Sequence, residues 1–279
     1  MLKNFSYFSD ITPTLKKILS LVFLFCFLLL EPACISLDQI SASNTITKKD
    51  ELLLAELRLV KLHLDQGDPS TAWSFLRPLT KIHADSSKVL NLAGITHLSL
   101  RNHKEALKYF EAAYKIDKDP AAALNISSTL IALGQYHKAR ELLIALLDKD
   151  SGYPFKERIL HNIGLSLHRQ GKLKIAQKYY NRALVENPSY YLSAFQLARI
   201  YQKLRKKNLA IKQFKSAIAL CKSCFEPVKV LASIYLKEGY QKQAEKVVQD
   251  YLKLKEISPI DEKSAHKLLA LAQKAKKPV

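Results

Sequence analysis

The chain contains few of the residues from which catalytic loops are usually built. Only seven glycines occur among its 279 residues, and it has neither a phosphate-cradling glycine loop nor a Gly-x-Ser-x-Gly nucleophile elbow. The eight histidines are scattered. His161 and His168 come nearest to a cluster, but they lack the His-Glu-x-x-His spacing of a zinc protease. We therefore expect a protein that is not an enzyme and that holds no metal and no cofactor.

Cysteine is also sparse, with four residues in the whole chain. Cys221 and Cys224 form a lone Cys-x-x-Cys pair. Such a pair is a weak zinc signal without a second pair, and a thioredoxin-like motif would need a strand before its helix. In an oxidising compartment, a local disulfide between Cys221 and Cys224 is the expected state.

Charge is absent from one run near the start, residues 18–30, which follows Lys16 and Lys17. Thirteen residues are too few to span a bilayer comfortably, but this length suits the apolar core of a secretory signal. We therefore expect residues 1–33 to be a signal peptide. Residues 34–50, which are rich in Ser and Thr, would then be a flexible tether.

Cys34 follows Ala33 directly after this apolar run. The arrangement resembles a lipobox, which implies lipidation of Cys34, although Glu31 and Pro32 depart from the usual lipobox residues. Ile35 and Ser36, which follow the cysteine, carry no acidic retention signal, so a lipidated protein would face the periplasm from the outer membrane. The alternative is ordinary cleavage near residues 40–42, which would release a soluble periplasmic protein.

Acidic residues are too few to balance the basic ones, and the formal net charge is +19. Removing Lys3, Lys16, Lys17, Asp10 and Glu31 with the signal leaves +18 from Cys34 onward. No nucleic-acid recognition motif is present, and we expect no nucleic-acid partner. Anionic headgroups, peptidoglycan carboxylates and acidic protein faces are the favoured counterparts, with solubility alone as an equally supported explanation.

Alanine, in contrast, recurs with a regular period. The intervals between successive members are 34, 33, 37, 34 and 34 residues, and the members are Ala72, Ala106, Ala139, Ala176, Ala210 and Ala244. The fullest frame around them is Gly164 … Gly171 … Ala176 … Tyr180 … Ala183 … Pro188. This frame resembles the tetratricopeptide repeat, a unit of two helices and 34 residues.

The resemblance implies an all-α protein, a right-handed α-solenoid of about six helix pairs over residues 51–258. Residues 259–279 would be a capping helix and basic tail, with Leu268, Leu269, Leu271 and Ala272 on its apolar side. The glycines that should end first helices in the left-handed conformation are Gly67, Gly134, Gly171 and Gly239.

The resemblance further implies that first helices line a concave, protein-binding groove. Asn125, Asn162 and Gln196 share the sixth position of consecutive units, where amides would hold an extended peptide backbone. Basic residues share the thirteenth position or lie near it, namely Arg169, Lys203, Lys237 and Arg199. They would bind a carboxylate or acidic stretch, while a solvated helix face explains them equally well.

One interval is lengthened to 37 residues, and the extra residues fall in 148–155, which contains Tyr153-Pro154. Asn162-Ile-Gly-Leu165 follows shortly after. Together these resemble the type IV pilus pilotin lipoproteins of the PilF/PilW type. The resemblance implies a membrane-anchored protein that assists the localisation or multimerisation of a secretin ring. The alternative is a periplasmic adaptor of another envelope complex, such as peptidoglycan synthesis or secretion.

Overall fold

The computed structural model describes residues 48–148 and 155–274. The expected signal peptide, Cys34, most of the tether, the Tyr153-Pro154 loop and the last five residues lie outside this part. Contacts divide the chain into a unit of residues 1–53 and a unit of residues 54–279. The helices described below lie in the second unit, except that the first of them begins at Lys48 in the first unit.

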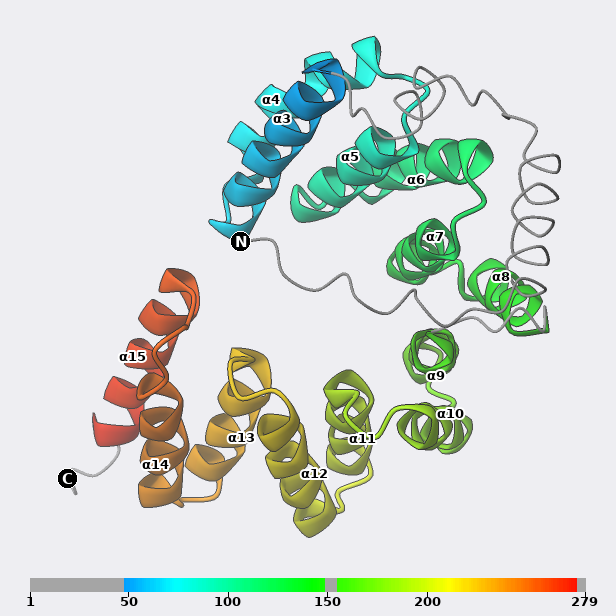
Figure 1. The fold of residues 1–279 in the computed structure, drawn as a ribbon. Coiled ribbons are helices and arrows are strands. Elements are labelled where there is room, and N and C mark those ends of the chain that lie inside the picture. Colours follow the sequence, from blue (N-terminus) through cyan, green and yellow to red (C-terminus); the bar gives the residue numbers. More distant parts are fainter. Residues whose placement is uncertain (1–47, 149–154, 275–279) are drawn as a thin grey trace, which may run out of the picture. The chain divides into compact units, whose positions relative to one another are not determined.

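Every regular element in the described residues is a helix, so the expected all-α fold is confirmed. Six helix pairs are followed by one further helix (Figure 1). The pairs are α3 (Lys48–Asp65) with α4 (Pro69–Ile82), α5 (Ser87–Ser99) with α6 (His103–Ile116), α7 (Pro120–Ala132) with α8 (Tyr136–Asp148), α9 (Lys156–Arg169) with α10 (Leu173–Glu186), α11 (Tyr191–Lys203) with α12 (Lys207–Leu220), and α13 (Phe225–Lys237) with α14 (Gln241–Leu252). The further helix is α15 (Pro259–Lys274). Within the described ranges, no helix has the length and apolar character needed to cross a membrane.

The helix boundaries follow from local sequence. Asp68 accepts a hydrogen bond from the Thr71 amide at the start of α4, and Asp119 accepts one from Ala121 at the start of α7. The four expected turn glycines all have φ between 75° and 78°. Two units place an arginine at the corresponding position, and Arg101 and Arg205 take φ values of 61° and 56°. The repeat geometry therefore imposes the left-handed turn even where the sequence provides no glycine.

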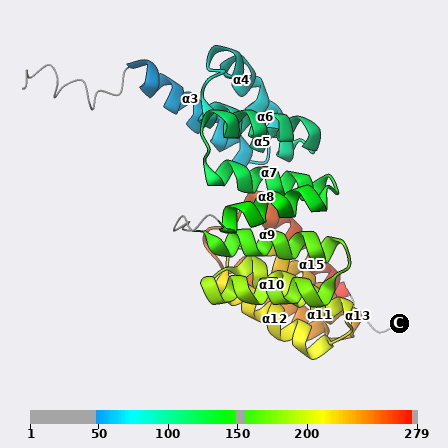
Figure 2. The same ribbon diagram turned by 90° about the vertical axis from the view of Figure 1, so that its right-hand side faces the viewer.

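The periodic alanines are buried at helix crossings, as the period predicts. Consecutive elements pack against each other from α4 to α15, and Figure 2 shows this layering for α7 to α10. At the α9–α10 crossing, a Cβ added to Gly164 would lie 2.8 Å from Cε1 of Tyr180, whose side chain is fully buried. Gly164 is therefore needed because a large ring fills the space beside it.

The capping helix α15 packs on α13 and α14. It buries Ala265 and Ala272, with Leu268 and Leu269 packed beside them. Leu271 was expected on this face but is 59% exposed. The reason is geometric: positions 265, 268, 269 and 272 share one side of a 3.6-residue helix, and position 271 does not.

Candidate functional site

Two of the three amides predicted at the sixth position, Asn125 and Asn162, lie where consecutive first helices meet. The Asn125 Nδ2 on α7 donates to Asn91 Oδ1 on α5 at 2.9 Å. The Asn162 Nδ2 on α9 donates to the Ser127 and Ser128 hydroxyls on α7, at 3.1 and 3.0 Å. Both amides thus join neighbouring repeats. Their contact with a peptide backbone remains a prediction, and it would involve their remaining hydrogen-bonding capacity.

A third polar contact continues this series between α9 and α11. The Nδ1 of buried His161 lies 3.0 Å from the Ser193 hydroxyl. Burial lowers the pKa of His161 to about 4, so the ring is neutral at physiological pH. Sequence reasoning missed this contact, although the separations of 32, 34 and 35 residues between partners were a usable signal.

Three of the predicted basic residues gather with Gln196 around one small cavity between α9 and α11. We call it the basic pocket; it encloses about 40 Å³ and is lined by Leu165, His168, Arg169, Gln196, Arg199 and Lys203. Arg169, Arg199 and Lys203 are exposed, whereas His168 is only 5% exposed. Exposed cations therefore surround a buried imidazole.

The pKa of His168 is affected both by burial and by the charge of this pocket. Burial, followed by the positive charges of Lys203, Arg199 and Arg169, lowers the pKa of His168 to about 4. Its Nδ1 has no hydrogen-bond partner among the residues that the structure describes. The spacing of His161 and His168 identified the pair but not this environment, because neither the burial of His168 nor its cationic neighbours can be read from spacing.

Lys237, the fourth member of the basic set, lies in a different cavity of about 330 Å³ between α11 and α13. We call this the acid-containing pocket; its lining is Gln202, Arg205, Lys207, Ala210, Ile234, Lys237 and Glu238. Here Lys207 forms an ion pair with Glu238. The four predicted basic residues, Arg169, Arg199, Lys203 and Lys237, which we call the basic column, are thus divided between two pockets. Only the acid-containing pocket includes a carboxylate in its lining.

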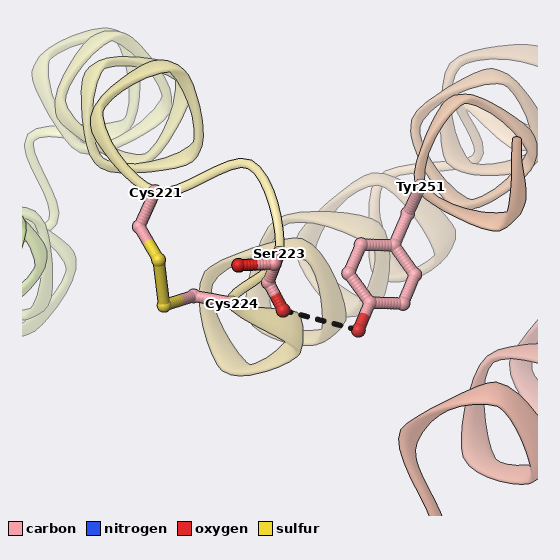
Figure 3. The surroundings of a disulfide bond; sticks show 4 residues. All are labelled: Cys221, Ser223, Cys224 and Tyr251. Atoms are coloured by element: carbon pink, nitrogen blue, oxygen red, sulfur yellow. Dashed lines mark hydrogen bonds between the residues drawn. A yellow bond between two sulfur atoms is a disulfide. The ribbon is translucent and has the colours of Figure 1, made fainter. Parts of the chain in front are cut away.

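The Cys221 and Cys224 sulfurs are bonded to each other in the turn between α12 and α13 (Figure 3). Within this turn the Ser223 carbonyl accepts a hydrogen bond from the Tyr251 hydroxyl of α14 at 3.2 Å. Among the described residues, no three His, Cys, Asp or Glu side chains come together as metal ligands.

Stacked helix pairs with a period near 34 residues define the class of helical-repeat solenoids. Profiles described as tetratricopeptide repeat match residues 87–120, 119–184 and 161–224. Residues 87–224 of the chain therefore belong to the tetratricopeptide-repeat family.

Solved structures support the same fold. Pseudomonas aeruginosa PilF is 18% identical with a TM-score of 0.54, and the match covers 79% of this chain and 99% of that one. PilW, described as a widely conserved type IV pilus biogenesis factor, is 16% identical with a TM-score of 0.56, covering 76% and 97%. At these identities the likeness shows the fold alone.

Among curated proteins, the regulatory protein RapG of Bacillus subtilis (strain 168) is 25% identical over 174 residues, or 57% of this chain. The match spans 48% of RapG. Mouse tetratricopeptide repeat protein 21A is 23% identical over 56% of this chain, and that match spans 14% of the mouse protein.

Proposed function

We propose that the protein is a non-enzymatic scaffold of the bacterial envelope, a pilotin-like lipoprotein that assists secretin assembly for type IV pili. The observation that carries most weight is a repeat stack whose fold matches nearly the whole length of PilF and PilW. The apolar run before Cys34 adds the expected export and anchoring signals. In this proposal the protein faces the periplasm from the outer membrane.

The partner would be an extended segment or helix lying along the first helices. The basic pocket supplies fixed positive charge for an anionic group of that segment. Gln196, which lines the same pocket, adds a neutral donor and acceptor. Asn125 and Asn162 lie on α7 and α9, where they would contact the backbone of the same segment.

Deletion and complementation test this role. A strain that lacks the protein should accumulate secretin monomers and lose surface pili. Arg169→Gln with Lys203→Gln should rescue poorly, because the basic pocket loses two of its positive charges. The protein level should stay normal, because both substituted side chains are exposed and support no core packing. Lys237→Gln is the matched control and should rescue well. Normal secretin multimers and pili in the deletion strain would eliminate the pilotin role.

The anchor has its own test. Cys34→Ser should move the protein from the membrane fraction to the soluble periplasm, because acyl chains supply most of the membrane affinity of such a lipoprotein. Incorporation of labelled palmitate checks the modification directly. Unchanged fractionation would contradict lipidation at Cys34 and leave the secretin role to be judged by the deletion strain.

The second candidate is an adaptor of another envelope complex, such as one for peptidoglycan synthesis or secretion. The matches to tetratricopeptide-repeat profiles support it equally well, because this fold serves many unrelated protein-binding roles. Affinity capture of the native protein from envelope extracts separates the two: a secretin would support the first role, and a peptidoglycan synthase the second.

A further inference from the structure

The basic pocket concentrates positive charge without neutralising it. Arg169 is in the last turn of α9, while Arg199 and Lys203 lie one turn apart on α11. No Asp or Glu side chain lines the cavity. Within the described part of the chain, none of these three cations forms a salt bridge. Three permanent charges around a cavity this small favour an anion strongly.

Buried polar groups beside the pocket also need a partner. His168 lines the cavity and is 5% exposed, yet its Nδ1 is without a hydrogen bond among the described residues. The hydroxyl of Tyr180 also lacks a partner among the described residues, but it does not line the cavity. Leaving the His168 nitrogen unsatisfied costs free energy, and an oxyanion that accepts a hydrogen bond from Nδ1, in the tautomer that carries its proton there, would offset that cost.

The acid-containing pocket shows that this charge is not a general property of the basic column. One repeat further on, Glu238 pairs with Lys207 in the cavity that Lys237 lines. The arrangement at α9 and α11 is therefore not repeated at the next junction, between α11 and α13. A merely solvated helix face would not explain why cations there surround a buried imidazole whose Nδ1 has no hydrogen-bond partner among the described residues.

The number of charges distinguishes between possible anions. A carboxylate brings one negative charge and two oxygens, whereas a phosphomonoester carries about −1.5 to −2 at pH 7 and three terminal oxygens. Arg169 and Arg199 present forked donors that match phosphoryl oxygens, and Lys203 adds a point charge. Because three cations line this small cavity, a single carboxylate would leave more of their charge unneutralised than a phosphomonoester would.

We propose that the basic pocket is a receptor for a phosphomonoester group. This goes beyond the scaffold role, because a phosphoryl receptor would exist whether or not the protein partner is a secretin. The phosphoryl group could be part of a soluble ester or of a lipid headgroup, and the two sources share the same recognition chemistry.

The test is calorimetric titration of the purified full-length protein at constant ionic strength, with methyl phosphate and acetate as matched probes. Methyl phosphate should bind about tenfold more tightly than acetate. Arg199→Met with Lys203→Met should weaken methyl phosphate binding about tenfold to a hundredfold, because two charge-assisted contacts are lost. Lys237→Met is the control and should leave the affinity within about twofold.

Arg199 also lies over the Phe195 ring, at 5.9 Å from its centroid, so thermal melts should accompany the double variant. If that variant unfolds, Arg169→Gln provides the same test from an exposed position on α9. Acetate binding as tight as methyl phosphate binding, or phosphate affinity unchanged in the folded variants, would overturn the proposal.

Vesicles distinguish the two sources. Phosphatidic acid displays a phosphomonoester, and phosphatidylglycerol displays only a singly charged diester. Binding to phosphatidic acid vesicles that depends on Arg199 and Lys203 would support a lipid-borne ligand, and a response to soluble methyl phosphate alone would support a soluble ester. A pocket-dependent affinity that is equal for both vesicles would count against a phosphomonoester receptor. These measurements need no secretin, so their failure is separable from failure of the pilotin role.

Discussion

The first helices of the fourth and last repeats, α9 and α13, hold equivalent places but bury different residues. The buried residues of α13 are Phe225, Pro227, Val228, Leu231, Ala232 and Tyr235. In contrast, α9 buries five polar or charged residues, namely Glu157, His161, Asn162, Ser166 and His168. Buried polar groups cost stability unless they are hydrogen-bonded, so α13 is the simpler packing element. Departures from apolar packing of this kind are typical of functional positions, and α9 lines the basic pocket.

The largest expected effect concerns how closely α9 and α10 pack where they cross. Gly164→Leu would drive a side chain into the fully buried Tyr180 ring and should lower the free energy of unfolding by about 3 kcal/mol or more. The corresponding residue of α13 is already alanine, and its neighbour four residues beyond the periodic alanine is Val248 rather than an aromatic ring. Ala232→Gly should therefore cost only about 1 kcal/mol through helix propensity.

Urea titration followed by circular dichroism measures both changes. A Gly164→Leu protein as stable as the parent would show that α9 and α10 do not cross as closely as the repeat frame requires. Equal losses at Gly164 and Ala232 would remove the contrast between the two repeats.

The next effect is the acid sensitivity that α9 introduces. The pKa of His161 is lowered from 6.5 to about 4 by burial, so between these values the unfolded chain binds a proton that the folded protein does not. Stability from this residue is complete above pH 6.5 and is lost as the pH falls toward 4. At pH 5 the loss should be about 2 kcal/mol.

His161→Phe copies Phe195, which holds the same position one repeat later. The substitution should remove this part of the acid sensitivity, so that the difference in unfolding free energy between pH 8 and pH 5 shrinks by about 2 kcal/mol. Urea titrations of parent and variant at both pH values provide the comparison. An unchanged difference would mean that His161 protonates as readily in the folded protein as in the unfolded chain.

These two repeats also show how far the sequence could be interpreted. The alanine period and the turn glycines predicted the helix pairs, because close crossings and left-handed turns restrict residue type directly. Arg169 and Lys203 were predicted to lie together because a 34-residue spacing places them on the same face of adjacent units.

Side-chain partners were harder to predict. Asn125 and Asn162 were predicted to line a groove, but a period does not say whether an amide turns toward solvent or toward the neighbouring helix, and both hydrogen-bond to the neighbouring helix. Lys237 belongs to the same column, yet its pocket includes Glu238, whose pairing depends on a turn one repeat away. His168 was considered only as a histidine near His161, because that spacing does not reveal its burial beside three cations.

The smallest effect concerns a hydrogen bond in the last repeat. It holds α14 to the preceding turn, and the fourth repeat has only an alanine at the same position. Tyr251 occupies the position that Ala183 holds in the fourth unit, and its hydroxyl ties α14 to the Ser223 carbonyl beside the disulfide (Figure 3). Tyr251→Phe keeps the ring against Phe225, at 5.1 Å between centroids, and removes only this hydrogen bond. The free energy of unfolding should fall by about 0.5–1.5 kcal/mol.

Tyr235→Phe is the control, because the Tyr235 hydroxyl makes no hydrogen bond within the described residues, and it should change stability less. Equal effects of the two substitutions in urea titrations would show that the Tyr251 hydrogen bond does not hold the turn, and that apolar contacts alone join the last two repeats.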